Sequence, residues 1–341
     1  MTSRRVPAVL LAMVLIVGCQ ARAVDNEQVP PETRITIRLS HVVAENTPKG
    51  IAARRFADLV SERSAGRIEV QVFPNSSLYA DGEEFQALLD DKIQLIAPST
   101  SLVADLVPEW QILDLPFLFA DAGQVSPSMV GPLGRRLMAL LEPTGMVGLG
   151  FWEGGFRQMT NNRHVLRLPP DFRGLRMRYQ ASPVRRQQFE LLGAQPVRGT
   201  FADLYRLLEQ GEADGQENSL SNIESKRLFE VQRYLTVSSH SYLGYVVLAD
   251  QDWWNALAKE DRDVLAGAQA ETADWLRANA PQIEADALDA IRASGDVLTH
   301  ELAPDERAIW RTTIDPIYRD LDGWLPGDLA EIVRSISTSQ P

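Results

Sequence analysis

Two arginines on one predicted strand are the residues of this sequence best suited to binding chemistry. In the stretch RGLRMRYQASP, apolar residues alternate with Arg176 and Arg178. A period of two is typical of a β-strand that buries one face, which places both arginines on the other face. A guanidinium presents a planar fork of donors that matches a carboxylate. The pattern therefore indicates an anion site, with a surface arginine or an ion pair within the protein as the alternatives.

Other polar side chains follow the ends of predicted strands, where α/β proteins usually bind their ligands. They are His41, Asp81, Ser99, Ser101 and His240. Each has a structural alternative, such as a packed imidazole or a helix-start acid that the helix dipole favours. A carboxylate such as Asp81 repels an anion, so in a pocket it indicates that a hydroxyl or amine is recognised at the other end of the ligand.

The sequence lacks the common motifs of enzymes and metal proteins. It has no Gly-rich phosphate loop, no His/Cys metal set and no GxSxG nucleophile elbow. Acidic neighbours such as Glu83 and Glu84 point apart on a helix, so they cannot flank a glycosidic bond. We therefore expect no cofactor or metal.

The charge of the chain limits its partners. The 341 residues carry a formal net charge of -12 at pH 7. Nucleic-acid binding relies on neutralising phosphates with Lys and Arg, so this charge argues against nucleic acid. An anionic small molecule is compatible with it only if a local cationic pocket overcomes the overall field.

Residues 1–23 have the features of an export signal. A basic start precedes an apolar run, Val6 to Val17, which is too short for a comfortable membrane span. Cys19, the single cysteine, ends the sequence IVGC, which resembles a bacterial lipobox whose cysteine is acylated after cleavage. Cleavage after Ala23 is the alternative. Both versions predict a periplasmic protein, either soluble or anchored through Cys19, with residues 24–33 as a flexible lead.

The rest of the chain alternates strand and helix patterns. RITIRLSH, RIEVQVFP and IQLIAPST have strand character, and helical segments separate them. A second series contains the arginine strand, a helix over residues 183–192 and the buried strand YLGYVVLA. A long helical region follows at 259–293, interrupted at Pro281. This order predicts an α/β fold in which helices flank mainly parallel sheets.

Seven segments occur in an order and at separations that resemble a known family. They are HVVAENTPKG, FPNSSLYADGEE, LDLPFLF, GFRQMTNNR, GLRMR, ADGQENSLSN and HSYLGYVVL. Together they resemble the DctP-type solute-binding proteins of tripartite ATP-independent periplasmic (TRAP) transporters. The resemblance covers about Ile35 to Asp320. No single motif identifies the family, but a chance match of seven motifs in register is very improbable.

The resemblance implies a two-lobed, periplasmic-binding-protein-like fold with a hinge cleft and a long helix that spans both lobes. On this basis we assign residues 34–154 and 243–283 to lobe I, and residues 155–242 and 284–331 to lobe II. A monomer of this kind is a binding protein and not an enzyme. It captures an organic acid and delivers it to a permease with a large and a small membrane subunit. The alternatives are a secreted hydrolase that uses acidic residues and a ligand-sensing component of a receptor.

The resemblance also assigns roles to three residues by motif match. Arg178 forms a bidentate salt bridge with the ligand carboxylate, Arg157 adds a second contact, and Asn218 orients the same carboxylate. The alternatives are a hinge arginine for Arg157 and a turn asparagine for Asn218. The sequence departs from the family pattern at Ser77, at Ser219 and in RGTF. The ligand therefore stays open among C4-dicarboxylates, sugar acids such as uronates, and keto acids.

Overall fold

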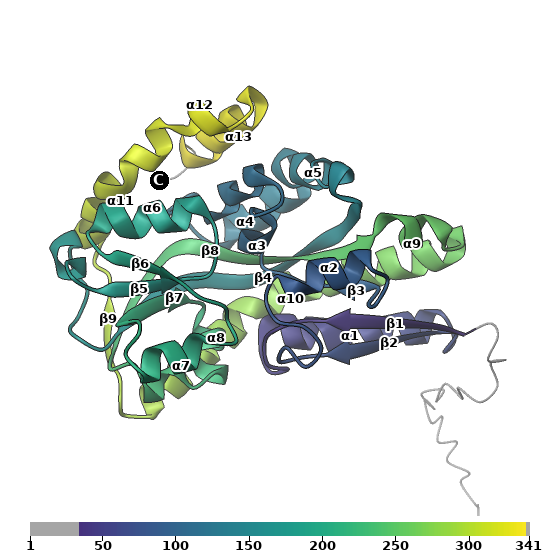
Figure 1. The fold of residues 1–341 in the computed structure, drawn as a ribbon, viewed down its shortest axis with the longest axis horizontal. Coiled ribbons are helices and arrows are strands. Elements are labelled where there is room, and N and C mark those ends of the chain that lie inside the picture. The colour runs from purple at the N-terminus through teal and green to yellow at the C-terminus, as the bar shows by residue number, and fades with distance from the viewer. Residues whose placement is uncertain (1–33, 339–341) are drawn as a thin grey trace, which may run out of the picture.

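The computed structural model describes residues 34–338, which form two lobes on one continuous mixed sheet (Figure 1). The strands are β1 (Ile35–Ser40), β2 (Ile68–Phe73), β3 (Leu95–Ile96), β4 (Met146–Asn161), β5 (Arg176–Tyr179), β6 (Gln195–Arg198), β7 (Gly215–Asn218), β8 (Tyr234–Asp250) and β9 (Leu298–Glu301). Their order in the sheet is β2-β1-β3-β8-β4-β7-β5-β6, and β9 pairs with β8. The predicted export signal, Cys19 and the lead at 24–33 lie outside the described residues.

Helices cover this sheet. They are α1 (Pro48–Arg63), α2 (Glu83–Leu89), α3 (Thr100–Val103), α4 (Ala122–Val130), α5 (Pro132–Ala139), α6 (Pro183–Leu192), α7 (Leu204–Glu209), α8 (Leu220–Ser225), α9 (Gln251–Ala256), α10 (Lys259–Ala293), α11 (Pro304–Arg319), α12 (Leu321–Trp324) and α13 (Gly327–Thr338). Within the described residues, no helix is both long and apolar enough to span a membrane.

Lobe I is built around the parallel strands β1, β2 and β3. Helix α1 follows β1 because Thr47 caps it, accepting the backbone N–H of Gly50, and Pro48 occupies its first turn. The apolar face of α1, including Phe56, packs on the sheet and is fully buried. This arrangement brings the start of α1 to the carboxyl end of β1, at the edge that faces lobe II.

Lobe II contains the parallel strands β5, β6 and β7, with α6 over residues 183–192 as predicted. Arg176 on β5 forms an ion pair with Asp214, at 3.0 Å between Nε and Oδ2, which is one of the alternatives that the sequence left open for these arginines. The C-terminal helices, yellow in Figure 1, run from α11 beside α6 to α13 beside α5. They therefore contact elements on either side of the cleft.

Strands β4 and β8 form a long antiparallel pair that runs through both lobes. Their pairing shifts register between Glu153 and Phe156 and again between Arg157 and Met159. Bulges of this kind bend a strand locally. The predicted lobe boundaries at 154/155 and 242/243 fall inside these two strands, and this division stays a prediction. That one sheet joins the lobes is a feature the sequence patterns did not indicate.

Helix α10 is continuous from Lys259 to Ala293, so the predicted interruption at Pro281 is wrong. A proline inside a helix removes one backbone hydrogen bond. Here the neighbouring turns hold the helix, because Leu276 and Ala287 are buried against the two lobes. The helix packs on α1 and β4 at one end and on α8 at the other, as expected for a helix that spans both lobes.

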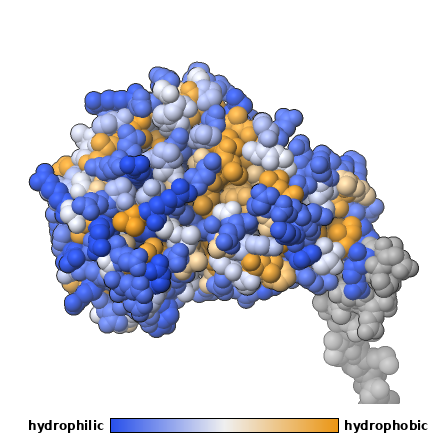
Figure 2. Space-filling model, in the orientation of Figure 1, coloured by the Kyte–Doolittle hydropathy of each residue, from blue (hydrophilic) through white to orange (hydrophobic). Residues whose placement is uncertain are grey.

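The surface of this face is mostly polar. Figure 2 shows hydrophilic residues over most of the view, with apolar residues gathered near its middle, in the region of α4 and α5 in Figure 1. The extensive polar surface agrees with the acidic composition of the chain.

Candidate functional site

Two arginines lie buried near the cleft without a carboxylate partner among the described residues. Arg178 on β5 is 1% exposed and Arg157 on β4 is 2% exposed. Arg178 donates from Nε to the carbonyl of Gly199 at 3.0 Å, while the described residues offer no hydrogen-bond partner to its Nη2. Arg157 donates weakly from Nη2 to Ser101 Oγ at 3.5 Å, and its Nε is without a partner there. Each guanidinium therefore keeps a buried donor for another group.

Local structure explains how Arg178 fits beneath the surface. It lies on β5 between β6 and β7, opposite Val197 and Gln216. A Cβ on Gly199 would lie 2.6 Å from Leu207 Cδ1 and 3.5 Å from Arg178 Cγ. Glycine at this position therefore lets Leu207 of α7 pack closely against the end of β6, beside the Arg178 side chain.

Burial makes both cations costly. It lowers the pKa of Arg178 to about 10 and that of Arg157 to about 9, with the Arg185 cation adding to the effect on Arg157. Both pKa values stay above neutral pH, so both side chains remain charged. An isolated buried charge is unfavourable, and an anion that supplies the missing countercharge relieves this cost.

The sequence reasoning missed a third buried arginine, Arg185 on α6, because PVRRQQ has the pattern of an exposed helix start. Its Nη2 lies 2.5 Å from Asp114 Oδ1, and its Nη1 lies 2.6 Å from Glu217 Oε1. All three side chains are buried. Burial alone raises the pKa of Glu217, but the Arg185 cation and His240 hold it well below its usual range. Arg185 thus pairs with Asp114 and Glu217, and among the described residues neither acid forms an ion pair with Arg157 or Arg178.

Two predicted site residues belong to this Arg185 cluster. His240 Nε2 lies 2.8 Å from Glu217 Oε2, and its Nδ1 lies 2.8 Å from Ser238 Oγ. Ser101 donates to Asp114 Oδ1 at 2.6 Å and accepts from Arg185 Nε at 3.2 Å. Both side chains therefore have protein partners. Ser101 also accepts the weak hydrogen bond from Arg157, so this cluster holds Arg157 in place.

A small cavity of about 10 Å³ lies where the lobes meet, with room for about one water molecule. We call it the central cavity. Three predicted residues, Arg157, Asn218 and Ser99, line it. The remaining lining residues are Val42, Val43, Lys49, Gln180, Phe201, Asn222, Leu243 and Tyr245. Arg178 is buried nearby but does not line this narrow space.

Asn218 is oriented by its neighbours. Its Oδ1 accepts from Asn222 Nδ2 at 2.8 Å, and Asn222 Nδ2 also donates to the hydroxyl of Tyr245 at 3.2 Å. Asn218 is the last residue of β7, and α8 begins two residues later. The strand end therefore presents two linked side-chain amides to the cavity.

Lys49 is a cavity residue that the motif assignment did not single out, although it stands in the segment HVVAENTPKG. Its Nζ donates to the carbonyl of Ala97 at 2.9 Å and lies 4.0 Å above the ring of Tyr245. Burial lowers the pKa of Lys49 to about 8 and raises that of neighbouring Glu84 to about 8. Lys49 was identifiable in principle, because it starts the helix that follows the first strand.

Two predicted residues of lobe I contact lobe II directly. Asp81 Oδ2 accepts from Gln180 Nε2 at 3.0 Å and from the backbone N–H of Phe201 at 2.6 Å. Ser99 Oγ donates to Gln180 Oε1 at 2.9 Å. The side-chain amide of Gln180 is thus held at both ends, and the lobes are in a closed arrangement.

The last predicted residue, His41, is fully buried and does not line the central cavity. Burial, together with the Lys49 and Arg54 cations, lowers the pKa of His41 to about 3. Its imidazole is therefore neutral at physiological pH, beside Lys49.

Comparison with known proteins decides the family. Residues 39–322 match the DctP family, described as bacterial extracellular solute-binding protein, family 7. The chain belongs to this family. The family consists of solute-binding proteins for transport, so the prediction of a binding protein and not an enzyme is confirmed.

Individual relatives of this DctP-family protein agree. The C4-dicarboxylate-binding protein DctB of Bacillus subtilis is 43% identical over 87% of this chain and 85% of its own length. A TRAP periplasmic solute-binding protein from Sulfurospirillum deleyianum, solved with bound succinate, is 37% identical with a TM-score of 0.85, covering 89% of this chain and 99% of that one. DctPAm from Advenella mimigardefordensis, solved with galactonate, is 32% identical with a TM-score of 0.86, covering 90% and 98%. The predicted family and two-lobed α/β fold are confirmed.

Proposed function

We propose that this protein captures a C4-dicarboxylate in the central cavity and delivers it to a TRAP permease. The observation that carries the proposal is the pair of buried guanidinium groups, Arg157 and Arg178, that no carboxylate of the described residues neutralises. A carboxylate placed between them receives charge-assisted hydrogen bonds from both. Asn218, oriented by Asn222, holds the same carboxylate.

The second carboxylate of the ligand pairs with Lys49 on the lobe I side. Lys49 lines the same cavity as Arg157, and burial has lowered its pKa to about 8. A nearby anion raises that pKa and favours the charged ammonium. This assignment favours a dicarboxylate over a monocarboxylate. It agrees with the succinate-bound relative and with the printed name of DctB.

Ligand entry requires the lobes to part, since about 10 Å³ does not hold a four-carbon acid. The bends of β4 between Glu153 and Met159 serve as the hinge. Opening breaks the contacts of Gln180 with Asp81 and Ser99. The ligand then favours closure, because only the closed form surrounds its charge with all three cations.

A sugar acid is the second candidate ligand. The galactonate-bound relative and the polar cavity side chains Asn222 and Tyr245 favour it. A sugar acid has one carboxylate and several hydroxyl groups, so it uses the arginines and amides but not the charge of Lys49.

The delivery step rests on the family. The partner is the permease with its large and small membrane subunits, and the protein works as a periplasmic monomer. Cys19 provides a lipid anchor if the export signal is cut before it. Metabolic labelling with a fatty acid, in the natural chain and in Cys19→Ala, tests this anchor: label in the natural chain alone supports it.

Calorimetric titration with succinate, malate and galactonate tests the binding proposal. We expect Arg178→Ala to lose about 2–5 kcal/mol of binding free energy, as for truncating one partner of a buried charge pair. Arg178→Lys also binds poorly, because an ammonium lacks the fork. Arg176→Ala is the matched control on the same strand, since its partner is Asp214. Affinity near wild type in Arg178→Ala contradicts the assignment.

A further inference from the structure

A second cavity, of about 280 Å³, lies at the bend of β4 beside β8 and shares no lining residue with the central cavity; we call it the hinge cavity. Side chains alternate between the two faces of a strand. Accordingly, Arg157 lines the central cavity while Phe156 and Gln158 line the hinge cavity, and Tyr245 and Tyr242 divide in the same way. The hinge cavity is therefore separate from the proposed organic-acid site.

The lining of the hinge cavity is acidic and apolar. It contains three carboxylates and, among the described lining residues, no lysine or arginine. Its apolar wall combines residues from both lobes and from α10, namely Ala120, Ala122, Val125, Phe156, Leu220, Val237, Ala280 and Pro281. A cavity of this size and composition suits a small molecule with an apolar body and a positive charge.

The three carboxylates differ in how they are paired. Asp121 caps α4 by accepting from the backbone N–H of Gln124. Glu284 accepts the backbone N–H groups of Leu220 at 2.8 Å and Ser221 at 3.1 Å. These two acids are therefore occupied by backbone donors.

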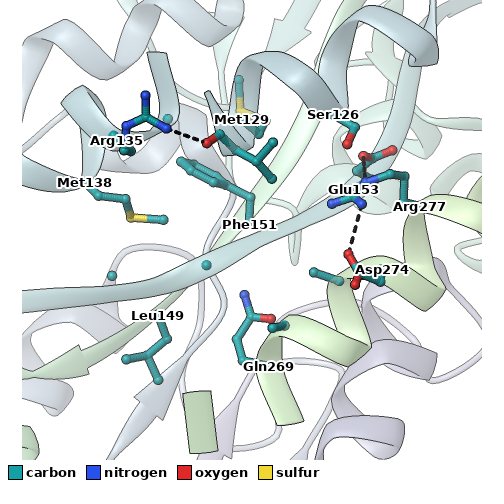
Figure 3. A pocket seen from close by; sticks show the side chains of 16 residues that line it. Ser126, Met129, Arg135, Met138, Leu149, Phe151, Glu153, Gln269, Asp274 and Arg277 are labelled. Carbon is teal, nitrogen blue, oxygen red and sulfur yellow. Dashed lines mark hydrogen bonds and ion pairs between the residues drawn. The ribbon is translucent and has the colours of Figure 1, made fainter. Parts of the chain in front are cut away.

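Glu153 is the carboxylate with the weakest pairing. It is 12% exposed, and Arg277 Nε approaches its Oε1 only to 3.9 Å. Arg277 also donates to Asp274 at 2.9 Å, as Figure 3 shows at the edge of a neighbouring pocket of about 600 Å³ that shares Glu153. Burial raises the pKa of Glu153, with Arg277 acting in the opposite direction.

The hydroxyl of Tyr242 is a second group in need of a partner. Tyr242 is 3% exposed, lines the hinge cavity, and has no hydrogen-bond partner for its Oη among the described residues. Its ring meets that of Phe156 edge-to-face, with centroids 6.3 Å apart. The hydroxyl lies beside Gly244, where an added Cβ would be 2.8 Å from Oη, and Gly244 is the cross-strand partner of Glu153. Burial, and then the charge of Glu153, raise the pKa of Tyr242.

We propose that the hinge cavity binds a small organic ammonium ion. The ammonium group donates to Glu153 and to the Tyr242 hydroxyl, and the ring of Phe156 adds cation–π attraction. The apolar body packs against Val125 and Pro281. A cation supplies a closer countercharge to Glu153 than Arg277 does and a donor to the Tyr242 hydroxyl, whereas an anion is repelled by Glu153 and Asp121.

The hinge cavity is placed to influence closure. Its wall includes the β4 bend between Glu153 and Phe156, where Gly155 has a φ of +93°. A molecule in this cavity favours the lobe arrangement in which the cavity exists. The coupling is reciprocal, so an ammonium ion and an organic acid strengthen each other's binding.

Calorimetric titration of the full chain with phenethylammonium, in the absence of any organic acid, tests the site directly. We expect millimolar or tighter affinity, with the isosteric neutral alcohol 2-phenylethanol binding about tenfold more weakly because it lacks the charge. Equal affinity for the two probes, or no heat from the ammonium at millimolar concentration, overturns the proposal. This test is independent of whether succinate is the ligand of the central cavity.

Variants locate the binding. Glu153→Gln keeps the shape and is expected to lower phenethylammonium affinity about tenfold, with exposed Glu142→Gln as the control of equal charge. Tyr242→Phe lowers the affinity by a smaller factor, and Ala280→Met, which fills the cavity, abolishes binding. Each variant is first shown to unfold cooperatively. Unchanged affinity in both Glu153→Gln and Ala280→Met overturns the site, and so does displacement of phenethylammonium by saturating succinate.

Discussion

The guanidinium of Arg185 lies 2.6 Å from the carboxylate of Glu217, and both side chains are buried. Asp114 is the second partner of this arginine, at 2.5 Å. The pair keeps Glu217 from neutralising Arg157, whose pKa the Glu217 charge influences. A paired arginine thus leaves its unpaired neighbours available for a ligand.

Removing Arg185 leaves two buried acids without their cation. We expect Arg185→Met to lower the free energy of unfolding by about 3–5 kcal/mol. The adjacent Arg186→Met is the control, because Arg186 is exposed and its ion-pair partner within residues 34–338 is Glu190, so its loss costs less than about 1 kcal/mol. Urea unfolding of both variants measures the difference. Equal effects show that the Arg185 cluster has no special role in stability.

Glu284 makes stability depend on pH. Burial raises its pKa from 4.5 to about 7, against the hydrogen bonds from Ser221 and Leu220. The folded state therefore binds this proton more tightly than the unfolded state, and the contribution is fully present below pH 4.5. It is lost as pH rises to about 7, a change of up to about 3 kcal/mol.

Glu284→Gln tests this contribution, because an amide does not titrate. Urea titrations at several pH values give the unfolding free energy of wild type and of Glu284→Gln. Between pH 4.5 and 7, we expect the free energy of unfolding of wild type to fall relative to that of Glu284→Gln. Taking the difference removes the effect of other groups such as Glu84. A constant difference across this range contradicts the prediction.

Lys49 distinguishes dicarboxylates from monocarboxylates. We expect Lys49→Met to lower succinate affinity about tenfold or more, since it removes the cation that meets the second carboxylate. Affinity for butyrate, which has the same carbon chain and one carboxylate, is expected to change less. Lys92→Met is the control, because Lys92 is exposed and pairs with Asp90. Calorimetry that shows equal losses for both acids contradicts this role.

Gln180 holds the lobes together before any ligand is bound. Its hydrogen bonds with Asp81 and Ser99 contribute about 1 kcal/mol each. We expect the lobes of the Gln180→Ala variant to part more readily. The radius of gyration of the ligand-free variant, measured by small-angle X-ray scattering, is then larger than that of wild type. Ligand affinity falls roughly tenfold, because the closed form is less populated. Exposed Gln71→Ala is the control, and an unchanged radius in Gln180→Ala contradicts the prediction.

Local patterns located some site residues from the sequence alone. The alternation around Arg178 identified its strand, whereas the pairing of Arg176 with Asp214 was only one of the alternatives that the pattern left open. Segment order predicted the family and the fold. These features depend on residues close in the chain, where periodicity is informative.

Features that depend on distant partners were not predictable in the same way. Arg185 looks exposed until Asp114 and Glu217, far away in sequence, are brought beside it. The continuity of α10 through Pro281 depends on packing against both lobes, which outweighs the local preference of proline. The joining of the two sheets by β4 and β8 depends on pairing between strands about 90 residues apart, for which the sequence contains no local signal.

The shared β4–β8 pair has a consequence for the order of events during biosynthesis. β3 pairs with β8, so the sheet of lobe I is incomplete until Asp250 has been translated, and its helical cover until α10 has followed. Neither lobe can fold independently while only the first half of the chain has been translated. The nascent chain therefore stays without its final cores until late in synthesis.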